Sequence, residues 1–226
     1  MRPVRLLTVG LMLALLPAGL AAQSVSSPYR FIETRHSPGI FGGYLLTDSG
    51  ALDLGPRSAP TFGVRYGLYL TGPLSVEASL GFASTDRQLY ARTATGGQTL
   101  LTPLGEVNTF LLMADGALKL RITGARAWRG IAPFGLLGAG LVADLGSSDA
   151  REAAIPEEQR FDIGPSFAAL GGLGTDFFVG DSFSLRVDVR DYLWRLSYPA
   201  GLTGLDENES DWTNNVMFTL GGAIHF

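Results

Sequence analysis

The segment 183–190 alternates strictly between two kinds of side chain. Apolar and polar residues take alternate positions: Phe183, Leu185, Val187 and Val189 against Ser184, Arg186, Asp188 and Arg190. Side chains of a β-strand point to opposite faces with a period of two, whereas a helix would spread these charges around its axis. The segment therefore predicts a β-strand with one apolar face and one ionic face.

The same alternation predicts eight strands along the chain. The clearest others are residues 61–71, 74–83 and 216–226, and the weaker ones are residues 39–46, 110–121, 130–143 and 164–179. The last two are rich in glycine, which fits bulges or barrel corners. The sequence has 30 glycines and no cysteine, so the strands have to form a stable domain without disulfides.

The connections between these segments alternate in length. Those after the second, fourth and sixth strands are short, at residues 72–73, 123–129 and 180–182, and the others are long, at residues 47–60, 84–106, 144–163 and 195–213. Short periplasmic turns and long outer loops are typical of transmembrane barrels, and an even strand number returns both termini to the periplasm. We expect an all-β fold: an eight-stranded antiparallel up-and-down transmembrane β-barrel.

The N-terminus has the layout of a signal peptide. Arg2 and Arg5 precede an apolar run, and the small residues at positions 21–22 offer a cleavage site. An uncleaved membrane anchor is the alternative, but the run is short for a bilayer crossing, and Pro17 and Gly19 interrupt it. The predicted organisation is a signal peptide at 1–22, a short leader at 23–35 and a barrel at 36–226.

Charge and composition exclude some partners and some folds. Removal of the signal peptide lowers the basic residues from 17 to 15 against 21 acidic ones, and no cluster of Lys and Arg remains to bind a phosphate backbone, so we expect no nucleic acid partner. Only 17% of the residues are charged, yet no apolar run after residue 22 is long enough for a transmembrane helix. A closed barrel, whose backbone groups pair strand to strand, satisfies both observations.

Alternation alone does not decide which face meets water. A soluble eight-stranded barrel points its apolar residues inward and its charges outward, the inverse of a transmembrane barrel. The sorted loop lengths favour the transmembrane arrangement. Aromatic residues near the predicted rims are consistent with interfacial girdles, with ordinary loop packing as the alternative: Trp194, Tyr198 and Trp212 at the outer rim and Trp128 at the inner rim.

The inner face predicts a balanced set of barrel-lumen charges. It contains four acidic and four basic residues: Arg65, Glu77, Asp115, Lys119, Asp176, Arg186, Asp188 and Arg190. The lumen of an eight-stranded barrel is only wide enough for side chains to fill, so we expect these groups to pair across it and plug it. A narrow ion path lined by the same residues is the alternative, disfavoured because the balanced charges attract neither sign of ion.

The chain resembles the OmpA-like family of small outer-membrane β-barrel domains. The resemblance rests on the predicted signal peptide, the eight alternating segments, the glycine-rich stretches 134–140 and 170–174, and the terminal Phe226. It implies a place in the cell outer membrane among outer-membrane lipids. It also implies an assembly signal in the last strand, read by the outer-membrane assembly machinery: Phe218, Leu220, Gly222, Ile224 and Phe226. No peptidoglycan-binding domain follows the barrel, so cell-wall attachment is not implied.

Few residues indicate catalysis or metal binding. His36 and His225 are the only histidines, and no third metal ligand accompanies them at the periplasmic rim where the first and last strands meet. The acidic run 206–211 lacks the glycine and final carboxylate of a calcium loop, which favours a solvated loop. The glycine-rich segments lack the Lys-Ser/Thr of a phosphate-binding loop. We expect no metal site, no cofactor and no enzymatic activity.

These observations predict an integral outer-membrane protein with a structural role in envelope integrity, whose long extracellular loops are available to surface ligands. Three alternatives stay open. The first is an adhesin or receptor-like interaction protein that acts through loops 84–106, 144–163 and 195–213. The second is a narrow channel, and the third is a lipid-modifying outer-membrane enzyme.

Overall fold

The structure is a computed structural model that describes residues 27–32, 34–95, 98–146, 149–161, 163–203 and 209–226, with the backbone alone at 93–95 and 98–100. The predicted signal peptide and the first part of the predicted leader lie outside the described residues.

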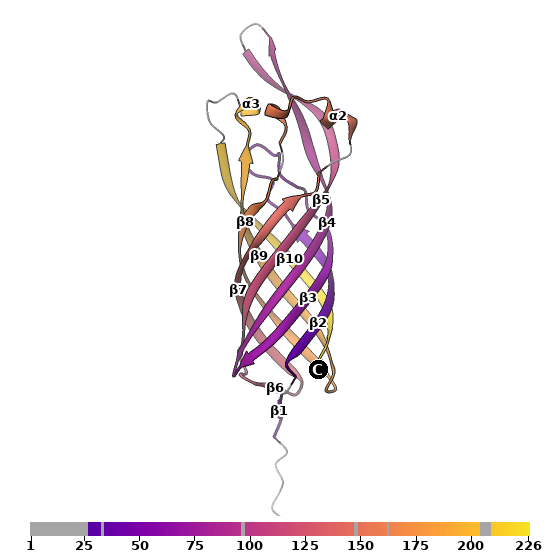
Figure 1. Cartoon of the computed structure of the whole chain (residues 1–226), viewed down its shortest axis with the longest axis vertical. Coiled ribbons are helices and arrows are strands. Elements are labelled where there is room, and N and C mark those ends of the chain that lie inside the picture. The colour runs from indigo at the N-terminus through magenta and orange to yellow at the C-terminus, as the bar shows by residue number, and fades with distance from the viewer. Residues whose placement is uncertain (1–26, 33, 96–97, 147–148, 162, 204–208) are drawn as a thin grey trace, which may run out of the picture.

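Eight long strands form one closed antiparallel barrel (Figure 1). They are β2 (His36–Leu46), β3 (Ala59–Thr71), β4 (Leu74–Thr95), β5 (Gln98–Arg121), β7 (Ile131–Asp144), β8 (Ser166–Val179), β9 (Phe183–Tyr198) and β10 (Glu209–Ile224). Each pairs with the next along the chain, and β10 pairs with β2, so the strands close into a ring. The predicted eight-stranded up-and-down fold is confirmed.

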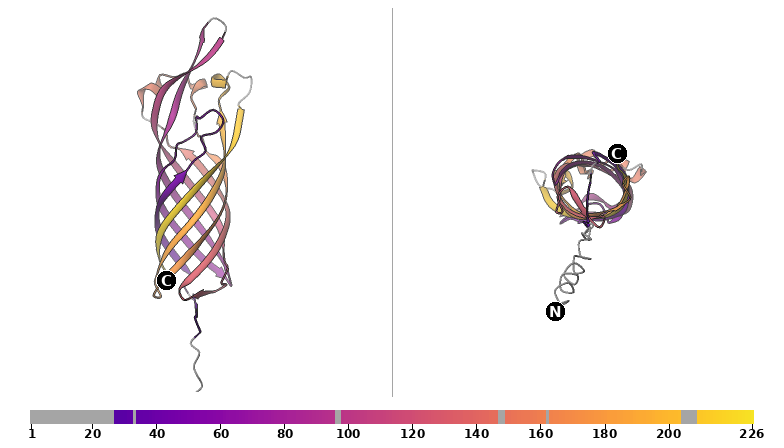
Figure 2. Two further views of the ribbon diagram at one scale, coloured as in Figure 1. Left: turned by 180° about the vertical axis from the view of Figure 1, so that it is seen from behind. Right: turned by 90° about the horizontal axis from the view of Figure 1, so that it is seen from below.

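Short elements lie at the two ends of the barrel (Figures 1 and 2). The strands β1 (Tyr29–Phe31) and β6 (Arg126–Trp128) pair with each other at the end that carries the short turns. At the end with the long loops lie α2 (Ala150–Ala153), the 3-10 turn η1 (Glu157–Gln159) and α3 (Ala200–Thr203). Among the described residues, no helix combines the length and apolarity needed to cross a membrane.

The barrel wall has an apolar outside and an ionic inside. On β9, Leu185 and Val187 are 45% and 47% exposed, whereas Arg186 is 6% exposed. Outward apolar residues of the other strands continue this surface, with exposed fractions between 37% and 74%: Ile40, Phe62, Val64, Leu80, Leu118, Leu137, Leu173, Leu220 and Ile224. We call this surface the apolar belt. An apolar outer surface of this kind is stable in contact with lipid acyl chains and unstable in contact with water, so the barrel wall spans a membrane.

The short connections lie where the alternation predicts them, at 72–73, 122–130 and 180–182. Two predicted long loops are wrong: most of 84–106 belongs to the β4–β5 hairpin, and 195–213 contains the ends of β9 and β10. The strands there extend beyond the apolar belt. On β9 the inward Trp194, Leu196 and Tyr198 are apolar while Arg195 and Ser197 face outward, so the alternation is the inverse of that in the lipid-facing part.

The glycines of β8 make room inside the lumen. Gly172 and Gly174 occupy inward positions in a β7–β8 ladder whose register is unbroken, so they do not mark the bulges that the sequence suggested. A Cβ atom at Gly174 would lie 2.5 Å from the ring of Phe134 and 2.6 Å from the Cβ of Asp188. These positions stay small because bulky groups from neighbouring strands fill the lumen beside them.

The apolar belt predicts that a charged side chain on the outer face of the barrel lowers its stability. Val187 pairs with Leu220 within the apolar belt. We expect Val187→Arg to lower the free energy of unfolding by about 2–4 kcal/mol, because a guanidinium in hydrocarbon loses its hydration. Val187→Ile is the matched control and should change it by less than about 0.5 kcal/mol. Urea unfolding in lipid vesicles measures both, and equal stability of the two variants would contradict an acyl-chain contact.

Candidate functional site: a sealed lumen and an extracellular platform

Arg190 is the centre of an ion-pair network in the lower half of the lumen. It is fully buried, and its Nε lies 2.8 Å from Asp188 Oδ1 while its Nη1 lies 3.0 Å from Ser79 Oγ and 3.3 Å from Asp115 Oδ1. Its Nη2 donates to Glu77. One guanidinium thus contacts three carboxylates from β4, β5 and β9, which joins separate parts of the barrel wall across the lumen.

The remaining predicted lumen charges join the same network. Arg65 Nη1 lies 3.0 Å from Asp188 Oδ2, and Arg186 binds Glu77 and lies 3.2 Å from Asp188. Lys119 binds Asp176. All eight predicted residues point inward with at most 9% exposure, and every one of them has an oppositely charged partner among the others. The structure brings the whole predicted set together.

The ring of Phe134 lies close to two of the cations. Lys119 Nζ lies 4.0 Å from the ring centroid, and Arg186 Cζ lies 4.2 Å from it. An aromatic face attracts cations that have lost their hydration, so Phe134 offsets part of the repulsion between these two groups.

Arg121 is a ninth lumen charge that the sequence analysis left out. It closes β5 on the same face as Asp115 and Lys119, and it is 6% exposed. The period of two along β5 extends to this position, so the signal was present in the sequence. With Arg121 the described lumen contains five cations and four carboxylates.

An apolar plug fills the upper half of the lumen. We use this name for nine buried inward residues: Leu45, Leu111, Met113, Leu136, Leu170, Tyr192, Trp194, Leu196 and Met217. Four buried residues of the outer loops pack in the same cluster: Leu54, Phe161, Ile163 and Leu202. These buried side chains occupy the lumen above the ion-pair network.

The aromatic girdle prediction is wrong for two of its four members. Trp194 and Tyr198 are 0% and 1% exposed and point into the barrel, because they share the parity of Arg190 on β9. Trp212 and Trp128 are 55% and 44% exposed at the outer and inner rims. This prediction and the predicted loop 195–213 are wrong for the same reason: the strand that corresponds to β9 is longer than the alternation at 183–190 predicts.

A short segment crosses the periplasmic mouth of the barrel. Ile32 N donates to Ala125 O beside β6, while Arg35 N donates to Phe226 O and Arg35 O accepts from Tyr69 N. The turn that contains β6 follows β5, on the side of the barrel opposite β2 and β10, so residues 28–32 and 34–35 pass from one side to the other (Figure 2). We call this segment the periplasmic strap.

The space left in the lower lumen is small. Two cavities there have volumes of about 30 Å³ and about 10 Å³, which is room for one or two waters or ions. The ionic network, the plug and the strap together occupy the lumen from the outer loops to the periplasmic mouth.

A second buried ion cluster holds the extracellular loops. Arg87, on β4 above the barrel, is 1% exposed and binds Glu152 of α2, and its Nε lies 3.4 Å from Asp144 Oδ2 at the end of β7. Its guanidinium also lies 5.9 Å from the ring of Phe161. Asp144 Oδ1 accepts from Gly146 N at 2.7 Å. No local pattern in the sequence marks this cluster, because Arg87 on β4 lies far along the chain from Asp144 and Glu152 and only folding brings them together.

The loops also brace the base of the β4–β5 hairpin. Arg151 donates to Leu104 O at 3.2 Å and to Glu106 O at 3.0 Å, and Arg57 Nε lies 3.1 Å from a Glu106 carboxylate oxygen. Leu89, Val107 and Ile155 form a separate buried apolar cluster between the hairpin and α2. We call the hairpin and the loops packed against it the extracellular platform.

Asp149 caps the N-terminus of helix α2 on this platform. Asp149 Oδ1 accepts from Arg151 N at 2.8 Å, and the Arg151 guanidinium binds the same carboxylate. These hydrogen bonds lower the pKa of Asp149 to about 2. The cap therefore stays ionised at any pH at which an outer surface operates.

The two histidines lie close along the backbone but on opposite sides of the barrel wall. Phe226 N donates to His36 O, yet the His36 ring faces outward, 2.6 Å from Tyr66 Oη, and the His225 ring faces inward, 2.7 Å from Ser184 Oγ. A shared metal ion cannot reach both rings through the wall. Among the described residues no group of three metal-ligating side chains converges, and the predicted acidic run 206–211 lies partly outside them.

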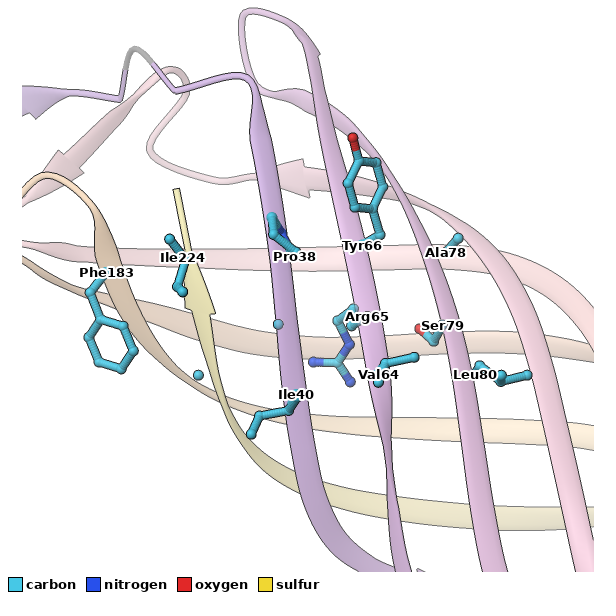
Figure 3. Close-up of a pocket in the computed structure, with 12 residues that line it drawn as sticks. Pro38, Ile40, Val64, Arg65, Tyr66, Ala78, Ser79, Leu80, Phe183 and Ile224 are labelled. Atoms are coloured by element: carbon cyan, nitrogen blue, oxygen red, sulfur yellow. The ribbon is translucent and has the colours of Figure 1, made fainter. Parts of the chain in front are cut away.

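A broad hollow lies on the lipid-facing side of the barrel (Figure 3). It measures about 830 Å³ and lies over the small residues Gly39, Gly222 and Ala78, between outward side chains such as Ile40 and Phe183. Its walls are apolar and face the acyl chains. Its position among outward apolar side chains fits a groove occupied by lipid acyl chains.

The predicted assembly signal forms the lipid-facing side of β10 and the residues after it. Phe218, Leu220, Ile224 and Phe226 are 46%, 62%, 59% and 67% exposed, and Gly222 is half-buried between them. This placement suits both a lipid contact and a recognition strand, and recognition by assembly machinery stays a prediction.

A family model described as outer membrane protein beta-barrel domain matches residues 11–226. The chain belongs to this family. It is an integral protein of the cell outer membrane, held among outer-membrane lipids by its apolar belt. No curated protein matches the sequence.

Solved structures of small outer-membrane barrels share the fold. The crystal structure of Neisserial surface protein A aligns with a TM-score of 0.54 and 11% identity over 88% of this chain and 98% of that one. The solid-state NMR structure of the outer-membrane protein AlkL in lipid bilayers aligns with a TM-score of 0.52 and 16% identity over 85% of this chain and 90% of that one. At these identities the likeness extends to the barrel alone.

The lumen network predicts a large effect of removing its central cation. Arg190→Met should lower the free energy of unfolding by about 3–5 kcal/mol, because Glu77, Asp115 and Asp188 each lose a buried counter-charge. Arg195→Met, on the same strand but exposed, is the control and should change it by about 0.5 kcal/mol or less. Urea unfolding followed by tryptophan fluorescence measures both, and similar values for the two variants would show that the network contributes no stability.

Proposed function

We propose that this protein is a sealed, non-catalytic membrane anchor that supports the envelope and presents the extracellular platform to ligands at the cell surface. The observation that carries the proposal is the β4–β5 hairpin. Its residues 84–95 and 98–110 form a ladder with each other and with no other strand, and the hairpin projects beyond the barrel wall (Figure 1).

The hairpin has the features of a contact element. Both of its outer strand edges leave backbone groups unpaired by neighbouring strands, and extended strands recognise partners through such edges. Leu101 and Leu104 are 39% and 38% exposed on it, in water beyond the apolar belt. Apolar side chains held in water on a projecting element favour binding to another surface.

The bracing at the base supports the same role. A buried cluster around Arg87 and the ties from Arg151 hold the hairpin relative to the barrel. A binding element fixed in advance loses less conformational entropy when it engages a ligand. Burying the charges of Arg87, Asp144 and Glu152 costs desolvation free energy. A hairpin that has to be held in a fixed position gives a reason to keep this cluster.

The sealed lumen disfavours the channel alternative, and the engaged carboxylates disfavour the enzyme alternative. The ionic side chains of the lumen bind one another across it, and the apolar plug lies above them. A catalytic group needs access to substrate and a free base or nucleophile. The lumen carboxylates that contact arginine or lysine in this network have neither.

Hairpin removal tests the surface role. Replacing residues 90–104 by a two-residue Asn-Gly turn should leave the barrel folded and abolish adhesion of expressing cells to fibronectin-, laminin- or heparin-coated surfaces, because the exposed edges and apolar residues are lost. The control is Glu157→Gln with Glu158→Gln, a pair exposed on η1 outside the hairpin, which should adhere as the wild type does. Adhesion that is absent in the wild type on all three surfaces, or unchanged after removal, would overturn the proposal.

Planar bilayers test the seal. We expect the reconstituted wild-type protein to show no conductance steps, because the plug and the ionic network occupy the lumen. Insertion is verified in the same lipid by protease protection of the barrel and by the mobility shift on boiling before electrophoresis. Reproducible steps from inserted protein would favour the narrow-channel alternative instead.

A further inference from the structure

Arg121 differs from every other charge of the described lumen. It is 6% exposed, yet no carboxylate of the described residues lies within ion-pair distance of it, and its Nε and Nη1 have no hydrogen-bond partner there. Its guanidinium carbon lies 5.9 Å from the rings of both Tyr69 and Phe178. A buried guanidinium without a counter-charge is strongly unfavourable.

The carboxylates around it are already engaged. Asp176 binds Lys119 and lies 3.7 Å from Arg186, and Glu77 binds Arg186 and Arg190. The other two carboxylates, Asp115 and Asp188, contact Arg190. Since the described lumen has five cations for four carboxylates, one positive charge is left over, and the contacts place it at Arg121.

Empty space adjoins this charge. The two small lumen cavities, of about 30 Å³ and about 10 Å³, share Arg121, Lys119, His225, Ser37 and Glu77 in their walls, and the Glu77 carboxylate is already bound by Arg186 and Arg190. The buried hydroxyl of Ser75, which also has no hydrogen-bond partner in the described chain, lines the smaller one. Thr34 and Arg35 of the periplasmic strap close it from below.

We propose that this space is a binding site for one small monovalent inorganic anion of the chloride class. The anion accepts from either Nε or Nη1 of Arg121, which lie on different edges of the guanidinium, and from the Ser75 hydroxyl, and its charge balances the lumen. The volume admits a monatomic ion and excludes organic anions such as gluconate. A water molecule in the same space would accept the hydrogen bonds but would leave the charge excess in place. The site does not depend on the proposed surface role.

An anion that binds only the folded barrel stabilises it. We expect the urea midpoint of the full-length protein in uncharged detergent micelles to rise saturably with sodium chloride, relative to sodium gluconate at equal ionic strength and pH 7. In Arg121→Gln this chloride-specific rise should disappear, because the excess charge is gone, while Arg195→Met should retain it. The mobility shift on boiling establishes that each variant is folded.

Equal midpoints in chloride and gluconate for the wild type would overturn the proposal, as would an identical chloride response in Arg121→Gln. If Arg121→Gln does not fold, bromide replaces the variant as the probe. Wild-type crystals grown in sodium bromide should show an anomalous peak within hydrogen-bond distance of Arg121 Nε or Nη1. A space occupied by water only, without anomalous signal, would contradict the site.

Discussion

The structure depends on the pairing of backbone N–H and C=O groups where no water is present to satisfy them. In the hydrocarbon layer each unpaired group costs several kcal/mol, so a sheet that enters it has to close on itself. The pairing of β10 with β2 and of β7 with β8 completes that closure without disulfides. The apolar belt, the buried charges and the small inward glycines follow from this closed wall.

Closure with eight strands makes a lumen that side chains have to fill, and this protein fills it in two ways. The lower half contains a network in which Arg190 contacts three carboxylates, and the upper half contains the apolar plug around Trp194. The network is stable only because each carboxylate is bound by at least one cation in a space without bulk water. The plug continues into the outer loops, which couples the barrel to the extracellular platform.

Much of the fold and of the lumen was predictable, since alternation is strongest where one face meets lipid and the other meets charge. Leu185, Val187 and Arg186 stand as predicted, and the eight lumen charges form one network. Prediction failed where strands left the membrane: the extension of β4 to Arg87 and of β9 to Trp194 and Tyr198 was read as loop. Beyond the lipid both faces of a strand are polar or packed by loops, so the period of two has no fixed meaning there.

The sequence by itself determined the class of the protein, because a two-residue period with apolar and ionic faces, no cysteine and no membrane helix after residue 22 allows few folds besides a closed membrane barrel. Only the tertiary structure decided which charges meet. Arg87 meets Asp144 and Glu152 from a distant part of the chain, the periplasmic strap crosses the barrel mouth, and Arg121 has no carboxylate within ion-pair distance among the described residues. Such contacts depend on strand register and loop packing, which join residues far apart in the chain and leave no local pattern in it.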